Sequence, residues 1–87
     1  MPTQALYFLN DPFFHDRAAA LARRVQPLAD AAARIAAVHR LALQRDPTAS
    51  EVERAARFLA AYPGGDEERL AAWVRVVLAS NEFLHVD

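Results

Sequence analysis

The chain has 87 residues, a net charge of −1, 54% hydrophobic residues, two glycines and no cysteine. This length suffices for one domain, and the composition is that of an ordered globular protein. The absence of cysteine excludes disulfides, thiolate metal sites, a catalytic cysteine and c-type haem attachment within these residues. No apolar run approaches the length of a membrane span, and the first residues lack the basic region and cleavage site of a signal peptide.

The N-terminal part contains an apolar run and a helix start signal. Five consecutive apolar residues, Ala5 to Leu9, favour a short helical turn or an extended arm. We expect the first main helix to have Asp11 as its N-cap and Pro12 at its first position, where the missing N–H is harmless. Pro27 should end or kink this helix. Its apolar stripe steps by four, three, four and three residues: Phe14, Ala18, Leu21, Val25 and Leu28.

A second helix is predicted after Asp30, which has the character of an N-cap. Its apolar face comprises Ile35, Val38, Leu41 and Ala42. The basic residues and the histidine are expected to lie largely on other faces: Arg34, His39, Arg40 and Arg45.

The segment from Ile35 to Leu59 is the one around which the other helices should pack. Pro47 cannot continue the second helix, and Thr48 and Glu51 have the spacing of a capping box that opens a third. The apolar stripe of this third helix is Val52, Ala55, Ala56, Leu59 and Tyr62. Pro63, Gly64 and Gly65 should stop it.

The fourth helix should be capped by Asp66, with Glu67 and Glu68 in its first turn, where the helix dipole favours negative charge. Its buried stripe is predicted as Leu70, Trp73, Val74, Val77 and Leu78. Ser80 and Asn81 are expected to end it. The closing residues form a tail whose Phe83 and Leu84 can pack back onto the core.

No segment shows the alternation of a β-strand. We therefore predict an all-α fold in one domain over residues 1–87: a compact bundle of four main helices, a short N-terminal helical turn or arm, and a C-terminal tail. Short loops favour roughly antiparallel helices. The bulk of the core should come from the large aromatic residues Phe8, Phe13, Phe14, Phe58, Trp73 and Phe83.

Residues with catalytic or ligand chemistry show no recognised spacing. His15, His39 and His85 lack a second histidine at i+3 or i+4 and are interpreted as surface residues. The acidic clusters stand at helix starts, where capping explains them, and Ser50 and Ser80 lack a nucleophile elbow. We therefore expect no catalytic residue, no cofactor and no metal ligand. An enzyme would need an apolar pocket with converging polar groups, such as His39 facing a carboxylate.

The arginines suggest a second hypothesis. They concentrate in residues 17–45 and the acids in residues 46–87, so the two halves can attract each other. Alternatively, Arg17, Arg24 and Arg34 could share a face with Arg40 or Arg45 and bind nucleic acid, with Arg54 and Arg57 on a helix-turn-helix. Glu51 and Glu53 on that helix would repel phosphate, and Glu53 has the favourable i,i+4 spacing to Arg57. Solvated or intramolecular pairing of the arginines is therefore favoured over nucleic-acid binding.

Three stretches resemble a known family: PTQALYFLNDPFF, RLALQRDPTASEVERAARFL and, most specifically, VLASNEFLHVD. They are similar to the C-terminal end of the planctomycete-specific domain of unknown function. That resemblance implies a helical domain at the end of large bacterial proteins that often carry cytochrome c-like domains upstream. It also implies an exported parent protein, with any redox chemistry supplied by the haem domain. No established activity, and hence no catalytic residue, is carried over.

From these observations we expect a non-enzymatic helical packing or protein-interaction module, within or derived from a longer chain. Its expected partner is another protein or a neighbouring domain of the parent. Self-association through the apolar arm, Leu6 to Leu9, is expected if that arm is exposed. The localisation stays undetermined.

Overall fold

The computed structural model describes the backbone of residues 11–84 and the side chains of residues 11–80. This part of the chain contains four helices and no strand: α2 (Pro12–Val25), α3 (Ala31–Leu43), α4 (Ala49–Ala61) and α5 (Asp66–Leu84). The predicted all-α fold with four main helices is confirmed. The predicted N-terminal arm, the last three residues of the tail and the side chains of Phe8, Phe83 and Leu84 lie outside the described residues.

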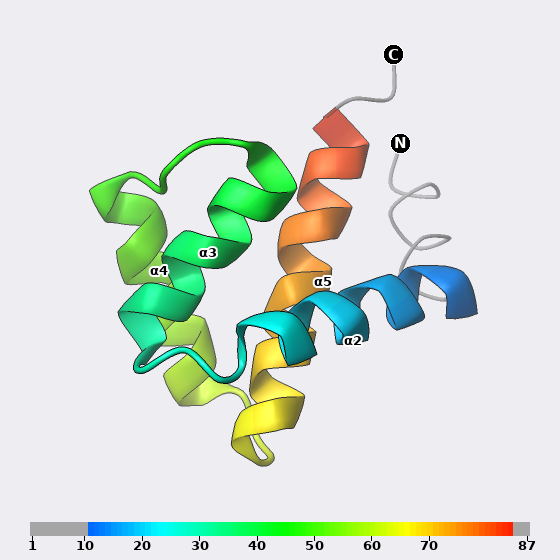
Figure 1. Cartoon of the computed structure of the whole chain (residues 1–87), viewed down its shortest axis with the longest axis horizontal. Coiled ribbons are helices and arrows are strands. Elements are labelled where there is room, and N and C mark those ends of the chain that lie inside the picture. Colours follow the sequence, from blue (N-terminus) through cyan, green and yellow to red (C-terminus); the bar gives the residue numbers. More distant parts are fainter. Residues whose placement is uncertain (1–10, 85–87) are drawn as a thin grey trace.

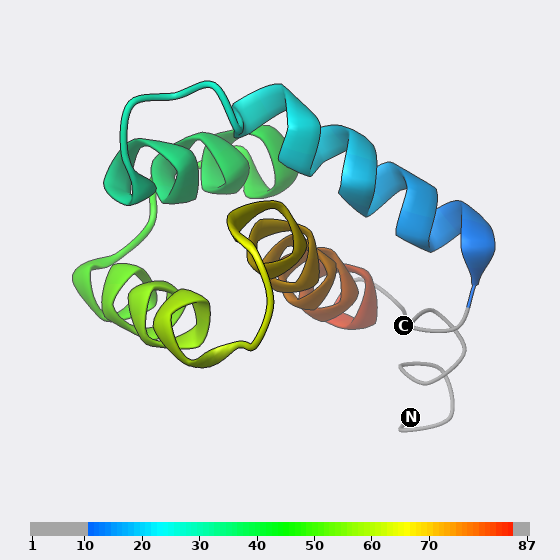
Figure 2. The same cartoon turned by 90° about the horizontal axis from the view of Figure 1, so that it is seen from below.

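The helices are arranged around α5. Seen from below, α2, α3 and α4 form an arc about it (Figure 2), and the most extensive helix–helix contact is between α2 and α5. In Figure 1, α3, α4 and α5 alternate in direction, whereas α2 lies across α5. The expected antiparallel arrangement therefore holds for three helices and not for α2. The five residues that join α2 to α3, including Pro27, allow the chain to change direction at that point.

The starts of α2 and α3 are capped as predicted. The backbone N–H of Phe13 donates to Asp11 Oδ1 at 2.9 Å, and that of Ala33 donates to Asp30 Oδ1 at 2.8 Å. Each carboxylate thus satisfies one of the N–H groups that a helix start leaves without a partner.

The predicted capping box of α4 is also confirmed. The N–H of Glu51 donates to Thr48 Oγ1 at 3.2 Å, and the N–H of Thr48 donates to Glu51 Oε1 at 2.8 Å. The helix ends at Ala61, before the predicted stop. Gly64 there has a φ of 116°, a conformation that residues with a Cβ rarely adopt.

Both ends of α5 differ from the prediction. The helix begins at Asp66, so Gly65 precedes it, and the N–H of Gly65 donates to Glu68 Oε1 at 3.0 Å. Glu68 thus accepts a hydrogen bond at the start of the helix, and Asp66, predicted as the N-cap, is its first helical residue. The helix also continues past Ser80 and Asn81 to Leu84. Serine and asparagine only weakly disfavour a helix, and no glycine or proline follows them.

The buried core combines all four helices. It comprises Phe14, Ala18, Ala22, Val25, Ile35, Val38, Ala55, Leu70, Trp73, Val74 and Leu78. Partly buried residues from the predicted stripes pack against it: Leu21, Ala42, Val52, Phe58, Leu59 and Val77. The predicted stripes are therefore confirmed in most of their members.

Four predicted core residues are exposed instead. Phe13 is 69% exposed because it lies about 100° around the helix from Phe14, which faces α5. Leu28 is 39% exposed because α2 has already ended at Val25, so helical spacing no longer applies. Leu41 is 44% exposed at the edge of its stripe. Ala56 is exposed beside the buried Ala55.

Candidate functional site

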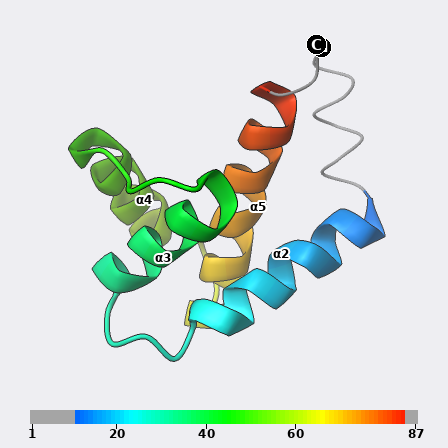
Figure 3. The ribbon, with the colours of Figure 1, turned by 45° about the horizontal axis from the view of Figure 1, so that its top comes forward.

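A pocket of about 510 Å³ lies between the end of α3, residues 51–58 of α4 and residues 73–80 of α5. Figure 3 shows the α3–α4 connection at the same end of the molecule as this part of α5. The walls of this α3–α4–α5 pocket are mostly apolar: Leu43, Ala55, Phe58, Trp73, Val76 and Val77. Its polar residues are His39, Arg45, Glu51, Arg54 and Ser80. The sequence carries no local sign of this pocket, because its residues come from three helices.

His39 forms the most buried polar part of the pocket. The residue is 4% exposed, and its ring lies against Trp73 with the ring centroids 5.8 Å apart. Its Nδ1 lies 2.9 Å from the carbonyl oxygen of Ile35. Because a carbonyl only accepts, Nδ1 must carry the proton, and Nε2 of the neutral ring is then an acceptor. Among the described residues, Nε2 has no hydrogen-bond partner.

The prediction of surface histidines is therefore wrong for His39. It lies four residues after Ile35 and shares the buried face of α3 with it. The hydrogen bond to the Ile35 carbonyl satisfies one ring nitrogen within the same helix, which lowers the free-energy penalty for burying the ring. His15 is half-buried, and His85 lies outside the described residues.

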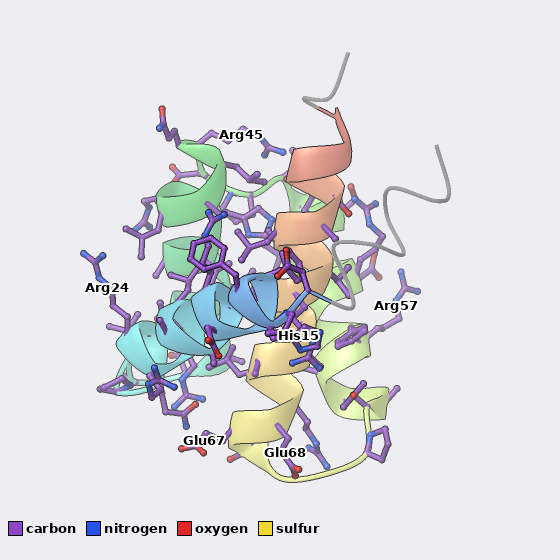
Figure 4. All side chains as sticks on the ribbon, turned by 90° about the vertical axis from the view of Figure 1, so that its right-hand side faces the viewer. His15, Arg24, Arg45, Arg57, Glu67 and Glu68 are labelled. Atoms are coloured by element: carbon purple, nitrogen blue, oxygen red, sulfur yellow. The ribbon has the colours of Figure 1, made fainter. Side chains whose placement is uncertain are left out.

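An ion pair between Arg45 and Glu51 forms part of the pocket rim. Nη1 and Nη2 of Arg45 donate to the two carboxylate oxygens at 2.8 and 2.7 Å. The hydrogen bonds from Arg45, and then that from the Thr48 N–H, hold the pKa of Glu51 well below its usual range. The same pairing raises the pKa of Arg45. Figure 4 shows Arg45 beside the C-terminal turns of α5.

These contacts define what the polar groups can do chemically. Glu51 accepts three hydrogen bonds and stays ionised, so it is a weak proton acceptor at neutral pH. Nδ1 of His39 donates to a backbone carbonyl, which fixes the tautomer of the neutral ring and leaves Nε2 as the acceptor. The structure thus brings His39 and a carboxylate into one pocket, but Glu51 is already bound to Arg45.

Several arginines pair with acids of the same chain, as the charge pattern suggested. Arg40 Nε lies 2.8 Å from Asp46 Oδ1, and Arg57 Nη2 lies 4.0 Å from Glu53 Oε1. With the Arg45–Glu51 pair, these contacts confirm the prediction of intramolecular pairing. Arg24, Arg45 and Arg57 point away from one another in Figure 4, so these three do not form one basic face.

A second, smaller pocket of about 290 Å³ lies between the starts of α3 and α5 and the end of α4. It is lined by Arg34 and Arg69 together with Asp66. Arg34 Nε donates to the carbonyl oxygen of Gln26 at 3.1 Å. Nε of Arg69 is buried without a partner among the described groups. Within the described residues there is no cluster of three metal-ligating side chains, and no helix is long and apolar enough to cross a membrane.

Comparison with known proteins places the chain in a family. The family model PSD1, whose description is "Protein of unknown function (DUF1553)", matches residues 1–59, more than half of the sequence. The chain belongs to the DUF1553 family. The resemblance to a domain of unknown function is thereby confirmed at this level. No match was found among curated proteins or among solved structures.

The residues that match the DUF1553 model form only part of the pocket lining. It covers α2, α3 and most of α4, and therefore the wall that carries His39, Glu51 and Arg54. The opposite wall, with Trp73 and Val76 on α5, lies beyond the matched residues. The pocket of this chain is completed by a helix outside the matched region.

Proposed function

We propose that this DUF1553 chain is a non-enzymatic helical module that binds a segment of another protein or of a neighbouring domain. The α3–α4–α5 pocket is where a side chain of that segment inserts. One observation carries the proposal: the pocket has apolar walls that include Trp73 and Phe58, with Arg45 and Arg54 among its polar residues. Protein interaction sites commonly combine an apolar centre, a polar rim, and anchoring tryptophan and arginine residues.

The polar groups of the pocket support binding rather than catalysis. Glu51 is held by Arg45 and Thr48 and serves the start of α4. His39 donates to the Ile35 carbonyl and offers its second ring nitrogen to a ligand. The polar groups of this pocket therefore suit hydrogen bonding to a ligand better than proton transfer. Nucleic acid is not proposed as the partner, since Arg40, Arg45 and Arg57 already pair with acids.

The resemblance described above extends this proposal to a parent protein. In the proteins that the chain resembles, cytochrome c-like domains lie upstream and the protein is exported. A haem domain would then be a candidate neighbour of the module. Reading the full gene tests this extension: a haem-attachment motif and an export signal in the same reading frame support it, and a frame without either contradicts it.

Two exposed residues provide a matched test of the pocket. Val76 on the pocket wall and Leu41 on α3 outside the pocket are both 44% exposed. Peptides are selected from a displayed random library on the full chain, and their affinities are measured for wild type, Val76→Glu and Leu41→Glu. We expect Val76→Glu to weaken binding roughly tenfold or more, because an unpaired charge is placed against an apolar ligand. Leu41→Glu should bind like wild type.

The proposal fails if Val76→Glu binds the selected peptides as tightly as wild type does. It also fails if the selection enriches no peptide above background. Circular dichroism of both variants checks that each retains its helices, so that weakened binding is not mistaken for unfolding.

A further inference from the structure

We propose that the side chain accepted by the α3–α4–α5 pocket is that of a tyrosine in the partner segment. Its ring lies against Trp73 and Phe58, and its O–H donates to Nε2 of His39. This inference rests on the proposed function, because it specifies the ligand of the same pocket. It follows from the tautomer of His39, from the charges around the pocket and from the shape of the candidate side chains.

His39 offers a hydrogen-bond acceptor to a ligand in the pocket. Its Nδ1–H donates to the Ile35 carbonyl at 2.9 Å, so the neutral ring presents Nε2 as an acceptor. The residue is 4% exposed and lines the pocket. An acceptor without a partner in the chain can accept a hydrogen bond from a ligand that supplies a donor. The pocket therefore favours a ligand with an O–H or N–H group at its inner end.

The charges around the pocket favour a ligand whose donor group is neutral. Arg45, from the α3–α4 connection, is neutralised by Glu51 at the start of α4. Among the described residues, Arg54 on α4 has a 3.4 Å hydrogen bond to Ser50 Oγ and no ion pair. Ser80 is the polar residue contributed by α5. A lysine or arginine ligand would be repelled by Arg54, so the favoured donor is neutral.

The shape of the ligand side chain must also match the pocket walls. Tyrosine has an apolar ring with a single O–H at its far end, which matches aromatic walls that lead to one acceptor. Tryptophan carries its N–H on the side of the ring, and serine or threonine has too little apolar surface for these walls. A ligand carboxylate would place a second acceptor against Nε2. The pocket volume of about 510 Å³ is in the range of small-ligand sites.

The partner segment should also be acidic next to the tyrosine. Arg54 is exposed and provides a guanidinium group beside the pocket. A neighbouring aspartate or glutamate in the segment can accept hydrogen bonds from it without entering the pocket. The ligand class is thus a peptide with tyrosine adjacent to an acidic residue.

The experiment compares N-acetyl-tyrosinamide with N-acetyl-phenylalaninamide, which differ only in the phenolic O–H. Trp73 is the only tryptophan of the chain, so its indole N–H signal in NMR titrations reports on this pocket directly. We expect the tyrosine probe to bind roughly three- to tenfold more tightly than the phenylalanine probe. The ¹⁵N signal of His39 Nε2 should shift on addition of the tyrosine probe only.

Two substitutions at His39 sharpen the comparison. His39→Phe removes the acceptor, so the two probes should bind equally; His39→Gln retains an acceptor oxygen and should restore part of the preference. Unfolding of His39→Phe would leave the comparison of probes on wild type fully informative. Equal binding of both probes to wild type, or no shift of the Trp73 signal with either, overturns the tyrosine inference.

Failure of this inference is distinguishable from failure of the proposed function. If library peptides require Val76 but carry leucine or phenylalanine in place of tyrosine, the pocket binds a partner and only the tyrosine assignment is wrong. If peptide binding is indifferent to Val76→Glu, the proposed function itself is wrong.

Discussion

Gln44 is a single residue whose backbone conformation affects the rim of the pocket. It is the C-cap of α3, with a φ of 60° and a ψ of 34°, and its N–H donates to the Arg40 carbonyl oxygen at 3.0 Å. The left-handed conformation is unfavourable for residues with a Cβ, by about 1–2 kcal/mol. The turn at Gln44 directs the chain so that the next residue, Arg45, meets Glu51. A locally unfavourable backbone thus contributes to the placement of the rim ion pair.

Substitution of Gln44 by glycine should stabilise the protein. Glycine adopts positive φ without the steric penalty, so we expect Gln44→Gly to raise the free energy of unfolding by about 0.5–1 kcal/mol. Gln44→Val should lower it, because a β-branched residue tolerates this conformation least. Urea unfolding followed by circular dichroism measures both variants. A lower stability for Gln44→Gly would show that positive φ is not the dominant effect at this position.

At the scale of elements, the start of α4 connects folding with the candidate site. The Glu51 carboxylate accepts from the Thr48 N–H and from both terminal nitrogens of Arg45. One side chain therefore caps a helix, closes the loop after α3 and forms part of the pocket rim. Hydrogen bonds to an ionised group are stronger than those between neutral groups, so these contacts should stabilise the short connection between α3 and α4.

The stability of the chain should therefore depend on pH through Glu51. Its pKa in the folded chain lies below the ordinary value of about 4.5. The stabilisation it provides is present above pH 4.5 and is lost progressively as the pH falls below that value. Glu51→Gln should be less stable than wild type at pH 7, and the difference should shrink toward pH 3. Urea midpoints measured across this pH range provide the test.

The matched control for this prediction is Glu53→Gln. Glu53 forms only an exposed pair with Arg57 at 4.0 Å, and exposed pairs contribute little to stability. This variant should follow the wild-type pH dependence closely. If both variants change the pH dependence equally, the effect reflects overall charge rather than the Arg45–Glu51 contact.

At the scale of the whole molecule, one core supports all four helices. α5 contributes Leu70, Trp73, Val74 and Leu78 to it, and the other helices pack around these residues (Figure 2). Trp73 belongs both to this core and to the pocket wall. The pocket is thus built partly on the helix around which the others pack, a suitable support for a binding site.

Burial rather than sequence pattern should decide the effect of substitutions on α3. Ile35 and Leu41 both belong to its predicted apolar face, but Ile35 is 1% exposed and Leu41 is 44% exposed. Ile35→Ala should cost about 2–5 kcal/mol through lost burial and a cavity. Leu41→Ala should stay within about 0.5 kcal/mol of wild type. Thermal or urea unfolding distinguishes them, and similar losses for both would contradict the packing described for α3.

Local signals in the sequence were sufficient for the number of helices and for most of their ends. Asp11, Asp30 and the Thr48–Glu51 capping box act through residues at most three positions apart, so their chemistry is visible without a fold. The prediction places the start of α5 one residue too late. Gly65 and Asp66 both follow a turn, and the hydrogen bond from the Gly65 N–H to Glu68 decides between them. The prediction ends α5 too early, at Ser80 and Asn81, because serine and asparagine are weak stop signals.

The amino-acid order alone thus determined an all-α protein with four helices, their caps and the greater part of their buried faces. Only the tertiary structure decided that His39 is buried, that Phe13 and Leu41 are exposed, and that a pocket lies between α3, α4 and α5. The physical reason is range: capping and helical periodicity act within one or two turns. Burial and pockets depend on which helices meet, and here His39 meets Trp73 from 34 positions further along the chain.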